Sequence, residues 1–72
     1  MTTSIIKHAI GANIGALGDM LRSAVRRVEE AEDAIVQGEQ NQAIGTILNL
    51  DEYLENALAL YRAAIALHRY GS

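Results

Sequence analysis

Apolar residues recur at alternating intervals of four and three along most of the chain. One series runs from Ile10 to Ile35, and a second runs from Ala43 to Ala64 and ends with His68 at the next position of the same spacing. This spacing keeps the side chains on one face of a helix, so it predicts two long amphipathic helices with coiled-coil-like seams. No proline interrupts them. The seams are Ile10, Ile14, Leu17, Leu21, Ala24, Val28, Ala31 and Ile35, and then Ala43, Ile47, Leu50, Leu54, Ala57, Tyr61, Ala64 and His68.

A polar stretch from Gln37 to Gln42 separates the two seams and contains Gly38. Glycine is favoured just after a helix because it adopts the left-handed conformation at little cost. We therefore expect one domain over residues 1–72, with a first helix at about 5–37, a turn at about 38–41 and a second helix at about 42–70. Two long helices joined by so short a loop must form an antiparallel hairpin.

The two seams match each other when they are paired outward from the turn. Ile35 then lies opposite Ala43, Ala31 opposite Ile47, and Ile10 opposite His68. Most of these layers combine a large aliphatic residue with an alanine. Such alternation lets facing layers interdigitate at a constant helix separation, so it supports this register.

A single hairpin of this size has too small a hydrophobic core to give it a large free energy of unfolding. Its 72 residues contain no cysteine, so it has neither disulfides nor thiolate metal ligands to stabilise it. The helices also carry apolar flanks beside the seams, and one partner helix cannot cover them. We predict an all-α fold in which the hairpin dimerises into a four-helix bundle. The expected oligomer interface consists of Tyr53, Leu58, Leu60, Ile65, Leu67, Met20 and Val25.

Charge and hydropathy favour a cytoplasmic protein that does not enter membranes. The formal net charge of −3 does not favour binding to nucleic acid or to an anionic lipid surface. The apolar run from Ala9 to Leu21 is broken by Asp19 and is shorter than the roughly 20 residues that a membrane span needs.

Three glycines, Gly11, Gly15 and Gly18, lie inside the first predicted helix. Each costs about 0.8–1.0 kcal/mol relative to alanine, so their presence calls for a physical reason. One interpretation is close approach of a neighbouring backbone, as in other small-residue contacts. The alternative is a kinked or frayed start, with the firm helix beginning near Asp19.

The sequence offers no convincing catalytic or metal-binding set. His8 and His68 lie at the same end of the predicted hairpin, but no carboxylate and no Glu-x-x-His pair lies close to either in sequence. No nucleophile, base and orienting residue occur together, and a small bundle has no room for a sizeable substrate pocket. We therefore expect neither an enzyme nor a bound cofactor or metal.

Charged residues cluster just after the middle of the first predicted helix. Arg22, Arg26 and Arg27 form a short basic ridge, and the acidic residues Glu29, Glu30, Glu32 and Asp33 come directly after it. A solvated outer face explains such a run. The ridge could also contact a phosphate backbone or an acidic partner, although the chain has no Phe or Trp to stack on bases.

Three functional hypotheses remain open at the level of sequence. The favoured one is a small self-associating hairpin that binds or regulates another, unknown protein. The second is a nucleic-acid-binding hairpin dimer that uses the arginine ridge. The third is a purely structural subunit that assembles through the flank of Tyr53, Leu60 and Leu67.

Overall fold

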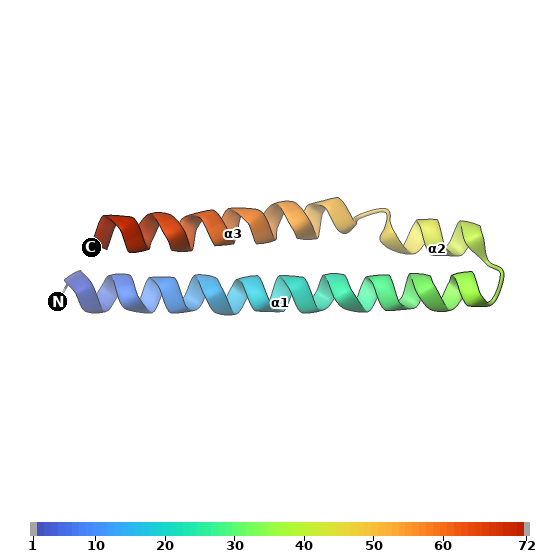
Figure 1. Cartoon of the computed structure of the whole chain (residues 1–72), viewed down its shortest axis with the longest axis horizontal. Helices are drawn as coiled ribbons and strands as arrows, with labels where there is room; N and C mark the ends of the chain where they lie inside the picture. The colour runs from blue at the N-terminus through green and yellow to red at the C-terminus, as the bar shows by residue number, and fades with distance from the viewer. Residues whose placement is uncertain (1, 72) are drawn as a thin grey trace.

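The computed structural model describes residues 2–71, and the side chains of residues 4–71. Three helices make up this part of the chain: α1 (Thr2–Val36), α2 (Gln40–Ile47) and α3 (Leu50–Gly71). The helices α2 and α3 follow each other along one line and run antiparallel to α1 (Figure 1). The hairpin measures 56 × 14 × 12 Å along its principal axes. The predicted all-helical hairpin is therefore confirmed, and α1 begins at Thr2 rather than near residue 5.

The end of α1 is closed by the glycine turn that the sequence predicts. Gly38 has a φ of 80°, in the left-handed region that glycine adopts readily. Its amide donates to the carbonyl of Ile35 at 2.9 Å, and the amide of Glu39 donates to the carbonyl of Ala34 at 2.8 Å. These two hydrogen bonds define a Schellman motif, which satisfies carbonyls that the helix end would otherwise leave unpaired.

The second arm of the hairpin is broken, whereas the sequence analysis expected one continuous helix over about 42–70. The ribbon leaves the helical path at Leu48 and Asn49, between α2 and α3 (Figure 1). Before the break, the Thr46 hydroxyl donates to the carbonyl of Gln42 at 2.9 Å, a contact that tends to bend helices. After it, Asn49 precedes the first turn of α3, whose acidic residues Asp51 and Glu52 suit a helix N-terminus.

Alanines form the buried centre of the hairpin. The buried residues are Ala24, Ala31, Ala34, Ala43, Ala57 and Ala64, and no larger apolar side chain among the described residues is fully buried. Ile47 packs against the cluster of Ala31, Ala34 and Ala43, as expected from the predicted register. Small side chains at these positions allow the two arms to approach closely.

The large members of the predicted seams lie mostly outside this contact. Ile14 is 56% exposed, Ile35 54% and Leu54 50%, so they do not fill the layers assigned to them. The arms instead contact each other at the alanines and on the side facing away from these large residues, where Met20 and Tyr53 are half-buried. One partner helix covers only a narrow stripe of each arm, and that stripe is centred on the alanines.

The helix α1 continues through all three of its glycines. A firm start near Asp19 is therefore not observed. A Cβ atom added at Gly11 or Gly15 would meet nothing within 4 Å, and the atoms nearest to one added at Gly18 would be those of the Arg22 guanidinium, at 3.2 Å. Within the hairpin, no other backbone lies within 4 Å of the Cβ positions at Gly11 and Gly15.

Candidate interaction surfaces

Most of the exposed large apolar residues gather on one side of the hairpin, which we call the apolar face. On α1 the residues Ile14, Leu21, Val28 and Ile35 are spaced by seven, and on α3 Leu54 and Tyr61 have the same spacing. Residues seven apart on a helix drift by only about 20°, so each set forms a row along its arm. The apolar face consists of Ile14, Leu21, Val25, Val28, Ile35, Ile44, Leu54, Leu58 and Tyr61, all of them exposed.

A groove near the loop brings large apolar residues of both arms together on one side of the molecule. It has a volume of about 510 Å³ and runs between the arms near the loop. Val28 and Ile35 line it from α1, and Ile44 lines it from α2. Buried Ala31 and Ala43 also line it, so the alanine contact lies between the two rows of large side chains. Glu32 is the one charged residue among the lining residues.

The other side of the hairpin is polar. A second, smaller hollow of about 280 Å³ lies there, lined by Met20, Arg27, Asn49, Glu52, Tyr53 and Asn56. The hairpin therefore has an apolar face on one side and, around this hollow, a polar surface on the other. An apolar helix face of this width is normally buried against another element.

Arg27 crosses from α1 to the second arm on the polar side. Its Nη1 atom donates to the carbonyl of Thr46 at 3.4 Å, and its Nη2 atom donates to the Tyr53 hydroxyl at 3.3 Å. The guanidinium carbon lies 5.5 Å from the centre of the Tyr53 ring, within cation–π range. The Thr46 carbonyl belongs to the last turn of α2, whose carbonyls lack intrahelical partners. Arg27 therefore bridges the break between α2 and α3.

The structure distributes the predicted interface residues over two environments. Leu58 and Val25 are exposed and belong to the apolar face. The remaining five are half-buried within the hairpin: Met20, Tyr53, Leu60, Ile65 and Leu67.

Conversely, most of the apolar face comes from residues that the sequence analysis assigned to the seam between the two arms. The recurrence of alanine at every seventh position, as at Ala24 and Ala31 and again at Ala57 and Ala64, is the signal that could have found it. The seam positions between these alanines carry the large side chains that remain exposed.

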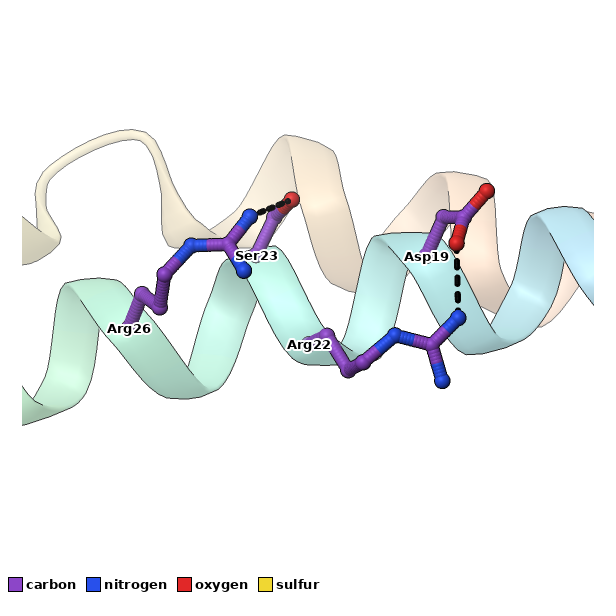
Figure 2. A network of polar contacts seen from close by, with 4 residues as sticks. All are labelled: Asp19, Arg22, Ser23 and Arg26. Carbon is purple, nitrogen blue, oxygen red and sulfur yellow. Dashed lines mark hydrogen bonds and ion pairs between the residues drawn. The ribbon is translucent and has the colours of Figure 1, made fainter.

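The arginine ridge is not a continuous row of unpaired cations. Figure 2 shows Arg22 and Arg26 each directed to a neighbour on its own helix. Arg22 forms an ion pair with Asp19 at 2.6 Å, and Arg26 donates to the Ser23 hydroxyl at 3.2 Å. The Arg22 and Asp19 side chains are 66% and 80% exposed, so solvent screens this pair. Arg27 points to the second arm, as described above.

Other site chemistry is sparse in the described part of the chain. No group of three or more His, Cys, Asp or Glu residues is placed there to hold a metal ion. His8 and His68 are both exposed. Over residues 4–71, every buried side-chain polar atom has a hydrogen-bond partner. No helix among the described residues is both long and apolar enough to cross a membrane.

Comparisons with protein-family models, with curated proteins and with solved structures find no match to this chain.

Proposed function

We propose that this protein is a small self-associating helical hairpin that serves as a protein–protein interaction or regulatory module, without catalytic activity. The observation that carries the proposal is the apolar face, which the hairpin leaves exposed to solvent. The cytoplasmic location expected from the sequence stays a prediction.

The size of the face supports self-association. From Ile14 to Ile35 it extends for roughly 30 Å at 1.5 Å per residue. Burying a Val, Leu or Ile side chain completely is favourable by about 1.5–3 kcal/mol, so covering one that is half exposed contributes about 1 kcal/mol. Contiguous apolar surface of this extent marks an interaction site in soluble proteins. Two copies docked face to face would form a four-helix bundle with the alanines and the large residues in one core.

Thermal unfolding at different protein concentrations tests the proposal. Because a dimer gains stability by mass action, we expect the melting temperature of the native chain to rise between about 5 and 500 μM protein. The double variant Ile14→Gln, Ile35→Gln should lose this dependence, since both residues lie on the apolar face. A melting temperature of the native chain that does not depend on concentration contradicts the proposal.

Ile5→Gln is the matched control. Ile5 is also on α1 and is 70% exposed, but it lies off the apolar face. We expect this variant to unfold like the native chain at every concentration. A loss of concentration dependence in the control as well would mean that the apolar face has no special role.

The nucleic-acid alternative has weaker support. Arg22 and Arg26 remain on the outer surface of α1, but Arg27 contacts Tyr53 on the opposite arm. Phosphate contacts make binding strongly dependent on salt. RNA or DNA binding that falls steeply between 50 and 200 mM salt, and that Arg22→Ala with Arg26→Ala abolishes, would favour this alternative over the interaction module.

A further inference from the structure

Charge is polarised along the long axis of the hairpin. Eight of the nine acidic residues lie in the segment from Glu29 to Glu55, and Asp19 is the exception. This segment contains no lysine or arginine. The two arms meet the loop within that segment, so it forms one end of the molecule (Figure 1). Three of the six basic residues, Lys7, Arg62 and Arg69, belong to the opposite half. The other three, Arg22, Arg26 and Arg27, lie beside the acidic segment, and Arg27 contacts Thr46 and Tyr53 within it. Eight acids outnumber three arginines in the loop half, so the loop half is net acidic, and the other half is net basic.

The same polarity borders the apolar face. On α1, Arg22 follows Leu21 and Glu29 follows Val28, so each charge lies beside a residue of the apolar face. On α3, Glu55 follows Leu54 and Arg62 follows Tyr61 in the same way. On each arm, the acidic residue of the pair therefore lies nearer the loop than the basic residue.

Two face-to-face arrangements of identical hairpins have two-fold symmetry. With both loops at the same end, α1 lies over α3 of the other copy, so the two acidic halves meet; Glu29 then lies near Asp51 across the interface, and Arg22 lies near Glu55. With the loops at opposite ends, each arm lies over its own counterpart, and the acidic half of one copy meets the basic half of the other. Helix directions alternate in both arrangements, so helix dipoles do not distinguish them.

We infer that the apolar face is covered by a second copy of this chain whose loop lies at the opposite end of the dimer. Charge complementarity favours this orientation, because a net acidic half meets a net basic half in it, whereas two net acidic halves meet in the alternative. In this arrangement Glu55 of each copy lies near Arg62 of the other, on either side of a two-fold axis close to Leu58. The inference rests on the proposed function, since it requires self-association.

The glycines of α1 fit the same arrangement. Gly11, Gly18 and Val25 are spaced by seven and share one row beside Ile14 and Leu21. An added Cβ at Gly11 would have open space around it in the isolated hairpin. With the loops at opposite ends, α1 crosses its own counterpart near Leu21 and Gly18. The Arg22 guanidinium, which lies 3.2 Å from the position of an added Cβ at Gly18, would move aside for the two backbones to approach closely there.

Distances between spin labels distinguish the two orientations. The chain has no cysteine, so Asn41→Cys near the loop and Ser4→Cys near the opposite end each provide one labelling site, and both residues are exposed. For loops at opposite ends, dimers labelled at residue 41 should give a separation approaching the 56 Å length of the hairpin. A mixed dimer labelled at residue 41 of one copy and residue 4 of the other should give about 20–30 Å, the interhelical spacing plus two label arms.

Each outcome decides between the claims. Short distances between two labels at residue 41 in a confirmed dimer would overturn the orientation and leave self-association intact. A monomeric mass with no dipolar signal would overturn both the orientation and the proposed function.

Charge exchange provides an independent test. Glu55→Arg or Arg62→Glu alone should weaken the dimer by about fivefold at low salt, and the double exchange should restore its affinity. Residues 55 and 62 are two turns apart on one helix and do not face each other there, so rescue reports a contact between copies. Glu52→Arg, at the polar hollow, is the control and should leave the dimer affinity unchanged. Failure of the double exchange to rescue, or a dimer that strengthens with salt, contradicts the orientation.

Discussion

Replacing Arg27 with methionine should destabilise the hairpin although the residue is charged and only half-buried. Methionine keeps much of the apolar stem but removes the guanidinium. The variant loses hydrogen bonds of 3.4 and 3.3 Å to Thr46 and Tyr53, together with the cation–π contact to the Tyr53 ring. At these long distances each hydrogen bond contributes about 0.5–1 kcal/mol. The cation–π contact adds about 0.5 kcal/mol at a partly exposed site.

The expected total loss is about 1.5–2.5 kcal/mol in the free energy of unfolding, from those same contributions. For a domain of this size, each kcal/mol lowers the melting temperature by about 4–8 °C. Circular dichroism during thermal and urea unfolding, at one fixed protein concentration, measures both quantities. Concentration must be fixed because association changes the apparent stability.

Arg26→Met is the matched control. Arg26 donates to Ser23 on its own helix and is exposed, so its replacement should cost less than about 0.5 kcal/mol. A double-mutant cycle of Arg27→Met with Tyr53→Phe should give a coupling energy of about 0.5–1 kcal/mol. If Arg27→Met costs no more than Arg26→Met, then Arg27 does not connect the arms as described.

Further predictions concern the helices and their contact. Gly15→Ala should raise the free energy of unfolding by about 1 kcal/mol in urea denaturation, because its Cβ meets nothing within 4 Å; a loss of stability would show that the site is crowded. Gly38→Ala should cost about 1–2 kcal/mol in the same assay, since its φ is 80°, and unchanged stability would contradict the left-handed turn. Ala43→Leu should cost about 1–3 kcal/mol because Ala43 is 3% exposed, whereas the exposed Ala59→Leu should be nearly neutral. Equal costs for the two leucine variants would contradict a core set by alanine.

The fold was largely predictable from the sequence because local signals agreed with one another. The seam period indicates helices, and the polar segment around Gly38 indicates the turn. The pairing near the turn also agrees with the structure, since Ile47 packs against the alanine cluster that contains Ala31.

The break at Leu48 and Asn49 was missed because the apolar period continues across it. Ile47, Leu50 and Leu54 keep the expected spacing. The local signal was present: Asn49 followed three residues later by Glu52 is typical of a helix N-terminus. Periodicity describes which side of an arm is apolar, and it does not show whether the arm is one helix or two.

The composition of the apolar face was harder to predict, because a heptad seam combines two kinds of contact. Ala24 and Ala31 lie between the arms, whereas Leu21 and Val28 in the same seam remain exposed. A two-helix picture assigns all four to the contact within the hairpin. In a four-helix bundle, each helix has two neighbours, so a seam can serve both.

Sedimentation equilibrium of the unmodified chain tests the central claim most directly. The chain has a mass of 7.8 kDa, and we expect twice that mass across the micromolar range, with dissociation on dilution. A single species of 7.8 kDa that remains folded and cooperative from micromolar to several hundred micromolar protein would show that the apolar face needs no second copy, and would contradict the account.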